Sequence, residues 1–242
     1  MSRGQPDYGL YTDTPVASGI SDPGEAAARL GSINIYDRRG WTVWMDDFEA
    51  PSLKWHSFFT APGGIAVLST TTAWMGIQSV FLNVPAGLLA ESYIDRIFPL
   101  IRLGKVGFEF WLQGVTKAPG YLRLRVDIYD GSTPYRTELL YDTTAEIIYI
   151  NTPAGTIPIA TGVFMAASSF YFLPVKLVVD MDTDLYTRLI VGAREFDIST
   201  HSAVALAASG DRYIHVYFYV HGEATIDKWM YIDNFIMTQN EP

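Results

Sequence analysis

Hydrophobic and polar side chains alternate along several segments of the chain after residue 41. In residues 122–128 the aliphatic and the polar side chains fall on opposite faces: Leu122, Leu124, Val126 and Ile128 against Arg123, Arg125 and Asp127. The Asp130-Gly131 pair that follows predicts a turn. A period of two is typical of a strand with one face buried. These segments are therefore predicted to be half-buried β-strands.

Residues 105–114 and the C-terminal third of the chain extend this pattern. Phe108, Phe110 and Leu112 alternate with Glu109, Trp111 and Gln113. Residues 213–220 and 230–237 are rich in β-branched and aromatic side chains, and residues 175–180 and 185–191 flank an acidic turn at 181–184. No long helical period competes, although 203–208 could form one helical turn. Short strands separated by turns predict an antiparallel all-β sandwich.

The first 40 residues have a different character. Glycine and proline recur there too often for regular strands. Asp22 and Pro23 are typical of a helix start, and Gly31 of a stop, so one short helix is expected between them. We therefore divide the chain into an N-terminal extension, residues 1–40, and a β-sandwich domain, residues 41–242. The extension is expected either to wrap its own domain or to reach a neighbouring subunit.

Composition excludes several partners. The chain has 242 residues, of which 49% are hydrophobic and 18% charged, with a formal net charge of -9. An acidic surface disfavours nucleic acid. No apolar run is long enough for a membrane span, and the N-terminus lacks the apolar stretch of a secretory signal. The absence of cysteine excludes disulfides and thiolate metal sites. Arginine outnumbers lysine, which is compatible with a thermophilic source.

Three segments carry a resemblance to a known superfamily. Residues 44–49 followed by Trp55, residues 231–236, and the hairpin over 174–180 and 186–192 resemble the opening strand, the closing strand and the paired central strands of concanavalin-like and laminin-G-like jelly rolls. The resemblance covers residues 41 to 238. It implies a jelly-roll sandwich whose first and last strands lie side by side. This superfold hosts lectins, glycosidases, adhesion domains and viral proteins, so it does not specify a function.

Catalytic motifs are largely missing from the sequence. A retaining glycosidase on this scaffold needs acidic residues at alternate positions of a strand, and the nearest match, Glu195 and Asp197, has Ser199 at its third position. None of the four histidines has a partner at the spacing of a zinc site, and His215 is expected to be a partly buried imidazole with a hydrogen-bonded partner. No nucleophile elbow occurs. The chain is therefore predicted not to be an enzyme.

Two groups of aspartates have side chains of the type that binds calcium. Asp180, Asp182 and Asp184 lack the glycine and the glutamate of a calcium loop, so an exposed hairpin turn is expected there. Asp46, Asp47 and Asp233 would come together if the terminal strands pair, and they are the candidate ligands of a structural calcium ion. No other cofactor is expected.

A glycan site needs exposed aromatic rings beside polar groups. The predicted set is Trp111, Glu109, Gln113, Trp41 and Trp229. Trp111 shares a strand face with Glu109 and Gln113. The alternative is that this outer face is covered by the N-terminal extension or by a neighbouring subunit.

Two functions follow from these observations. The first is a non-enzymatic assembly protein, such as a capsid decoration, coat or tail subunit of a virion, that forms homo-oligomers through its N-terminal extension and is located in a virion or an extracellular assembly. The second is a carbohydrate-binding or adhesion module that recognises glycans through surface aromatics.

Overall fold

A computed structural model describes residues 36–37, 39–60, 63–86, 90–100, 104–114, 121–164, 171–222 and 227–242. Within these ranges every regular element is a β-strand, which confirms the predicted all-β class. The short helix expected after Asp22 lies outside the described residues. No described segment forms a helix with the length and hydropathy that crossing a bilayer requires.

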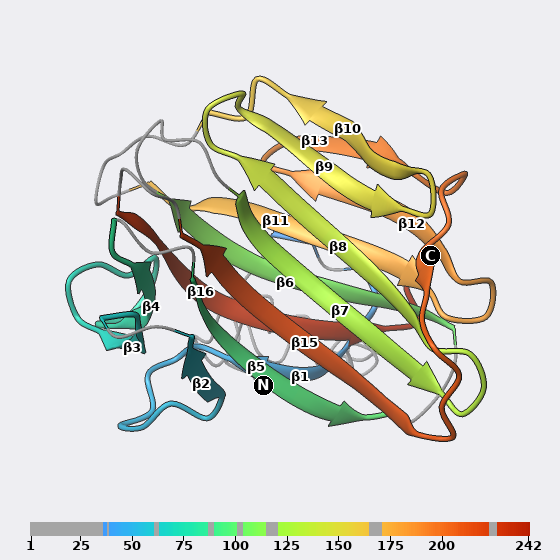
Figure 1. Ribbon diagram of the computed structural model, residues 1–242, viewed down its shortest axis with the longest axis horizontal. Coiled ribbons are helices and arrows are strands. Elements are labelled where there is room, and N and C mark those ends of the chain that lie inside the picture. Colours follow the sequence, from blue (N-terminus) through green and yellow to red (C-terminus); the bar gives the residue numbers. More distant parts are fainter. Residues whose placement is uncertain are drawn as a thin grey trace, which may run out of the picture.

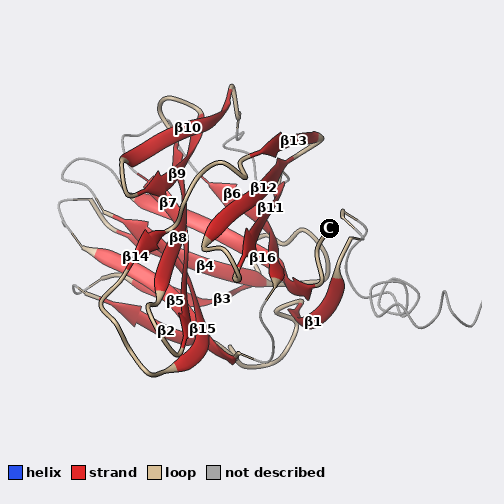
Figure 2. Cartoon of the chain, turned by 90° about the vertical axis from the view of Figure 1, so that its right-hand side faces the viewer, coloured by secondary structure: helices blue, strands red, loops and turns tan. Residues whose placement is uncertain are grey.

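The strands form two antiparallel sheets that stack face to face (Figures 1 and 2). Sheet A runs in the order β13 (Arg194–Asp197), β12 (Leu185–Val191), β11 (Leu173–Asp180), β6 (Lys105–Gly114), β16 (Lys228–Gln239), β4 (Ser79–Val84) and β3 (Ile65–Ser69), with β1 (Trp41–Asp46) also paired to β16. Sheet B runs in the order β10 (Gly155–Thr161), β9 (Ile147–Thr152), β8 (Tyr135–Asp142), β7 (Tyr121–Asp130), β15 (Arg212–His221), β5 (Glu91–Pro99) and β2 (His56–Phe59), with β14 (Val204–Ala205) paired to β8.

One hydrophobic core fills the space between the sheets. It contains the aliphatic side chains of 122–128 and the phenylalanines of β6, as their alternation predicted. Trp55 belongs to an aromatic cluster of this core, with its ring centroid 5.1 Å from that of Phe235 and 5.8 Å from that of Phe218. Tyr186 of sheet A reaches across the core: its hydroxyl accepts the Glu138 N–H at 3.0 Å and donates to the Asn151 carbonyl at 2.6 Å. The two sheets are thus joined by the packing of the core and by the two hydrogen bonds of the Tyr186 hydroxyl.

Two topological predictions are confirmed. The hairpin of β11 and β12 pairs Val175 with Val191 around the acidic turn, and the first strand lies beside the last, with Asp46 opposite Phe235. The pairing of β16 with β6 is interrupted by a bulge between Asp233 and Ile236, where Asn234 has a φ of 49°. Asparagine tolerates this left-handed conformation better than most residues.

Candidate functional site

The predicted aromatic set on sheet A is buried. Trp111, Glu109 and Gln113 share the outer face of β6, as the alternation implied. Their exposed fractions are only 3%, 1% and 1%. A glycan cannot stack on a ring that is covered to this extent. The outer face of β6 is therefore not an open glycan-binding surface.

The described end of the N-terminal extension supplies part of the cover. Tyr36 packs edge-on against Trp111 with 5.5 Å between ring centroids, and its hydroxyl donates to the Gly192 carbonyl at 2.8 Å. Trp74, from the β3–β4 loop, stacks on Trp111 at 6.2 Å. Residues 36, 37 and 39 thus lie against their own domain, and the rest of residues 1–38 is outside the described residues.

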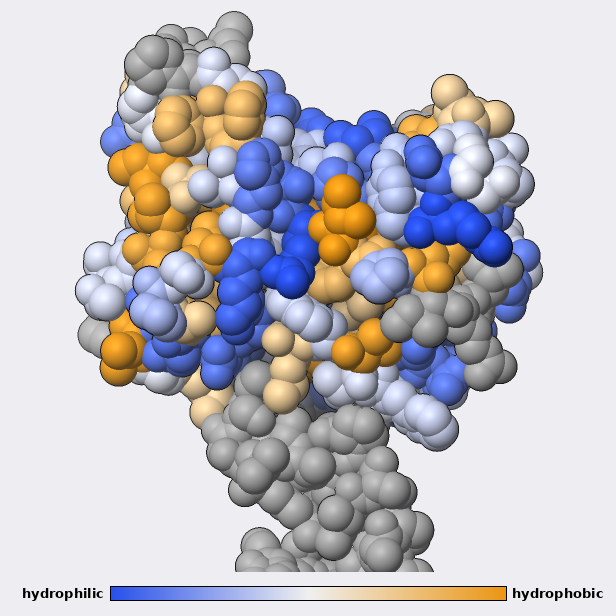
Figure 3. Space-filling view, turned by 90° about the horizontal axis from the view of Figure 1, so that it is seen from below, coloured by the Kyte–Doolittle hydropathy of each residue, from blue (hydrophilic) through white to orange (hydrophobic). Residues whose placement is uncertain are grey.

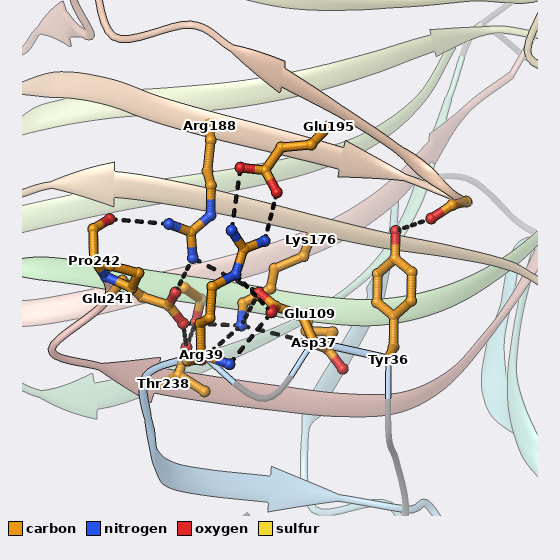
Figure 4. Close-up of polar contacts among 12 residues, drawn as sticks. Tyr36, Asp37, Arg39, Glu109, Lys176, Arg188, Glu195, Thr238, Glu241 and Pro242 are labelled. Atoms are coloured by element: carbon orange, nitrogen blue, oxygen red, sulfur yellow. Dashed lines mark hydrogen bonds and ion pairs between the residues drawn. The ribbon is translucent and has the colours of Figure 1, made fainter.

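A buried ionic cluster holds this cover in place (Figure 4). The fully buried Lys176 ammonium lies 3.0 Å from Asp37, 2.9 Å from Glu241 and 3.6 Å from Glu109. Arg188 adds an ion pair to Glu241. The ammonium joins the N-terminal segment, β6 and the C-terminal end of the chain, so this cluster has a structural role.

The other two predicted aromatic residues, Trp41 and Trp229, differ from each other in exposed fraction and in the residues that they contact. Trp41, at the start of β1, is 64% exposed. Trp229 is half-buried against Phe81 and Tyr231, which belong to the same aromatic cluster as Trp111. The structure therefore does not bring the five predicted residues together as one open surface.

Each of the predicted calcium ligands accepts hydrogen bonds from the protein, and the second oxygen of Asp46, Oδ2, is buried without a hydrogen-bond partner among the described residues. Asp46 accepts the Phe48 N–H at 3.0 Å and the Lys54 ammonium at 3.1 Å, and Asp47 accepts a backbone N–H two residues later. Asp233 accepts backbone N–H groups of the 74–75 loop and of its own neighbour, and burial raises its pKa to about 7. Among the described residues no three acidic or histidine side chains form a metal-binding group. The terminal strands pair as expected, but their carboxylates anchor loops.

The outer face of sheet B is open, unlike the covered outer face of sheet A. Its central strand, β15, places side chains at every second position on this face: Tyr213, His215, Tyr217, Tyr219 and His221. Their neighbours between them, Ile214, Val216, Phe218 and Val220, are buried in the core. Figure 3 views the molecule with sheet B's outer side upward, and the upper outline is hollowed between two raised sides. This is the open face of the sandwich, which we call the sheet B face.

Cross-strand register arranges the sheet B face in rows. Tyr217 lies opposite Asp95 of β5 and Arg125 of β7, and His56 of β2 continues this row beyond Asp95. Side chains at directly opposite positions are close enough to interact. The row thus combines a phenol, a carboxylate, an imidazole and a guanidinium from four strands that lie far apart in sequence.

A second row is richer in aromatic rings. Tyr219 lies opposite Tyr93 and Arg123, and Phe58 lies on the far side of Tyr93. The Phe58 and Tyr93 ring centroids are 5.3 Å apart, and the Arg123 guanidinium lies 5.4 Å from the centre of the Tyr219 ring. Tyr93 also meets Tyr217 edge-on at 6.1 Å. The rings of the two rows are therefore in contact with one another.

Two arginines on the sheet B face are held in place by one shared carboxylate. Asp127 is nearly fully buried and accepts hydrogen bonds from Arg125 and from Arg136, the latter at 2.7 and 3.0 Å. Burial of the Asp127 carboxyl works against ionisation, but the hydrogen bonds from both arginines outweigh it and lower its pKa. Two guanidiniums share one carboxylate, so this group carries a net positive charge.

A chain of hydrogen bonds crosses the face. The Tyr217 hydroxyl lies 2.9 Å from His215 Nδ1, and His215 Nε2 lies 2.8 Å from Asp95 Oδ2. The other Asp95 oxygen lies 2.7 Å from His56 Nδ1. His215 is thus partly buried with hydrogen-bonded partners, as the sequence suggested. Its place in a chain of four titratable groups was not foreseen.

Comparison with known proteins identifies the fold. No protein-family model matches the chain, and no curated protein sequence matches it. Among solved structures, an endo-β-1,4-glucuronan lyase from the fungus Trichoderma reesei matches with a TM-score of 0.56 and 10% identity over 82% of this chain and 96% of its own. A cellulose induced protein matches with a TM-score of 0.53 and 15% identity over 81% and 96%. A Bacillus subtilis protein of unknown function with a galectin-like fold matches with 0.52 and 13% over 85% and 98%. At these identities the likeness concerns the fold, and it places the chain among jelly-roll and galectin-like β-sandwiches.

Proposed function

We propose that this protein binds carbohydrate through the sheet B face. The observation that carries the proposal is the pair of Phe58, which is 43% exposed, and Tyr93, whose ring centroids lie 5.3 Å apart on the hollowed sheet B face beside anchored arginines. Aromatic rings stack on the apolar faces of sugar rings, and fixed polar groups orient the hydroxyls.

The rigidity of the polar groups supports this proposal. Glu138 accepts the Asn151 amide at 2.8 Å and the Tyr219 hydroxyl at 3.3 Å, and Asp127 holds both of its arginines. Side chains held in this way lose little conformational freedom when a ligand binds. Two proteins of similar fold, the glucuronan lyase and the cellulose induced protein, have names that refer to carbohydrate, which agrees with this proposal; the likeness to them concerns the fold.

A glycan array compared across three proteins tests the proposal. The wild type is expected to bind a defined set of glycans, and Tyr93→Ala is expected to weaken binding about tenfold because it removes a stacking ring. Trp41→Ala is the matched control, since Trp41 is also exposed but belongs to sheet A. Binding to no glycan, or binding that survives Tyr93→Ala, would refute the assignment of this face.

A second candidate is an assembly subunit, and one observation favours it. The edge strands β2 and β3 expose Phe59, Ile65 and Val67, and exposed apolar edges are prone to pair with another copy. Light scattering after size exclusion separates the candidates: a stable oligomer that dissociates on Val67→Lys supports assembly, and a monomer at high concentration argues against it.

A further inference from the structure

A pocket lies at the edge of the sandwich that is opposite strands β2 and β3. Its walls come from the loop after β10, the segment that leads into β11, and the hairpin between β12 and β13. β10 is an edge strand of sheet B and β13 an edge strand of sheet A, and Figure 2 shows the two strands at the same end of the sandwich. The pocket has a volume of about 360 Å³, which is in the range of small-molecule sites. None of its described lining residues belongs to the sheet B face.

The base of the pocket is apolar. Val163, Leu173 and Val191 line it, each is almost fully buried, and all three belong to the core between the sheets. The apolar part of a ligand that enters the pocket therefore leaves water for a surface that continues the core, which is favourable. This base favours a ligand with an apolar body over a strongly hydrated one.

Hydrogen bonds hold the two sides of the pocket in place. On the sheet B side, the Val163 carbonyl accepts the Tyr141 hydroxyl at 2.7 Å. On the sheet A side, the Gly192 carbonyl accepts the Tyr36 hydroxyl at 2.8 Å, and the Gly192 N–H donates to the Pro174 carbonyl at 3.0 Å. Walls that are already fixed lose little conformational freedom when a ligand binds. The site is therefore formed before a ligand arrives.

Two aromatic rings of the pocket remain in contact with water. Phe164 and Tyr171 both line it, and their exposed fractions are 56% and 42%. Burying an aromatic ring is favourable, and flat rings stack on other flat rings. Exposed rings beside an apolar base thus favour a ligand that carries a planar ring of its own.

The charged group of the pocket is the guanidinium of Arg194. Its two terminal nitrogens each donate to the Thr161 carbonyl at 3.1 Å, and its central carbon lies 5.4 Å from the centre of the Phe196 ring. These contacts fix the guanidinium between the edges of the two sheets. Arginine has five N–H donors, so three remain for a ligand, and the side chain is exposed to solvent.

The charge of Arg194 is not neutralised by a neighbouring carboxylate. The described acidic side chains form no ion pair with it, and the adjacent Glu195 pairs with Arg39 instead. By contrast, Arg125 on the sheet B face is paired with Asp127. A guanidinium beside an apolar surface attracts an anion more strongly than one surrounded by water, because the attraction is screened less. Its planar fork of N–H donors matches the geometry of a carboxylate.

We propose that this pocket binds a small aromatic carboxylate, with the ring of the ligand on the apolar base beside Phe164 and Tyr171 and its carboxylate on Arg194. This second site goes beyond the proposed carbohydrate binding and does not depend on it. A neutral sugar lacks the charge that Arg194 complements, and a free phosphate lacks the apolar body that the base receives. An aliphatic carboxylate lacks the planar ring.

Isothermal titration calorimetry of the full chain with sodium trans-cinnamate tests this assignment. Two matched probes separate the contributions: cinnamamide has the same ring without the charge, and octanoate has the charge without the ring. Cinnamate is expected to bind at least about tenfold more tightly than cinnamamide, because a hydrogen bond to a charged group is stronger than one between neutral groups. It is also expected to bind more tightly than octanoate because its ring stacks.

Three variants assign the residues. Arg194→Met removes the charge and is expected to weaken cinnamate binding about tenfold while cinnamamide binding stays the same. Tyr171→Ala removes a stacking ring and is expected to weaken the binding of both. Arg212→Met is the matched control, since it removes a charge from an exposed position outside the pocket, at the start of β15. Circular dichroism verifies the fold of each variant.

Nuclear magnetic resonance locates the bound probe. Cinnamate is expected to shift the amide signals of Gly162 and Gly192, which both line the pocket, and to leave those of β15 unchanged. Shifts confined to β15 and its neighbours would overturn the assignment, because the probe would then occupy the sheet B face.

The affinities decide the remaining points. Absence of cinnamate binding at millimolar concentrations, or equal affinity for cinnamate and cinnamamide, overturns the proposal. Tighter binding of octanoate overturns the preference for an aromatic ligand, and undiminished cinnamate binding by Arg194→Met overturns the role of the guanidinium.

The glycan array keeps this site distinct from the proposed function. Arg194→Met is expected to bind glycans as the wild type does, and Tyr93→Ala is expected to bind cinnamate as the wild type does. Displacement of cinnamate by a glycan would overturn the independence of the two sites. Cinnamate binding without any glycan binding would refute the proposed function and support this pocket.

Discussion

Lys176 is the charge on which the cover of sheet A depends. It lies in β11 with a fully buried side chain, and its ammonium contacts Asp37, Glu241 and Glu109 and donates to the Arg39 carbonyl at 3.1 Å. Lys176→Met keeps a side chain of similar length and removes the charge. The buried carboxylates then lose their common partner.

The size of the effect follows from this burial. Removing one member of a buried ion pair costs about 3–5 kcal/mol because a buried charge is left uncompensated. Arg188 still pairs with Glu241 and Arg39 with Asp37, which offsets part of the loss. We therefore expect Lys176→Met to lower the free energy of unfolding by about 3 kcal/mol, at the low end of that range.

Equilibrium urea unfolding measures this loss, and hydrogen exchange locates it. Exchange is expected to accelerate at residues 36–40 and 241 while the strands of sheet B keep their protection. Arg212→Met removes one charge from an exposed position at the start of β15 and is expected to change stability by less than about 0.5 kcal/mol. If Lys176→Met and Arg212→Met unfold alike, the cluster does not hold the cover.

Three further predictions concern the rest of the sandwich. The pKa of Asp127 is lowered in the fold, so its contribution to stability is complete above about pH 4 and is lost as the pH falls below that value. Asp127→Asn should remove this acid dependence in urea titrations at several pH values and cost about 3 kcal/mol at neutral pH, because two arginines lose their buried partner. Tyr186→Phe should cost about 2 kcal/mol in the same assay because two buried backbone groups lose their partner, and an unchanged midpoint would contradict the bridge between the sheets. Gly107→Ala would place a methyl group against Thr238 Oγ1, 2.8 Å from Glu241 Oε1 and 2.9 Å from the Lys176 side chain, and it is expected to lower the melting temperature; a melting temperature equal to that of the wild type would show that the cluster can yield.

Much of the fold was predictable because strand alternation is a local property. The aliphatic positions of 122–128 and the phenylalanines of β6 enter the core where the pattern placed them. The hairpin of β11 and β12 and the pairing of β1 with β16 were also found as expected. These features depend on neighbouring residues or on strand ends shared by the whole superfold.

The candidate site was harder to predict because alternation cannot show whether an outward face is open. Trp111 and Tyr217 both lie on outward faces of central strands. Tyr36 and Trp74 cover the first, and the second remains accessible. One signal in the sequence did point to sheet B: the alternation of Tyr213, His215 and Tyr217 opposite the core positions of the same strand.

The sequence by itself thus determined which side chains enter the core and which lie outside, because that choice depends on a period of two within each strand. Only the tertiary structure decided which outer face is open and which polar groups meet on it. The Asp95 carboxylate and the His215 imidazole are 120 positions apart, and they meet because cross-strand register brings β5 beside β15. No local pattern encodes that register, since it results from the packing of the whole sandwich.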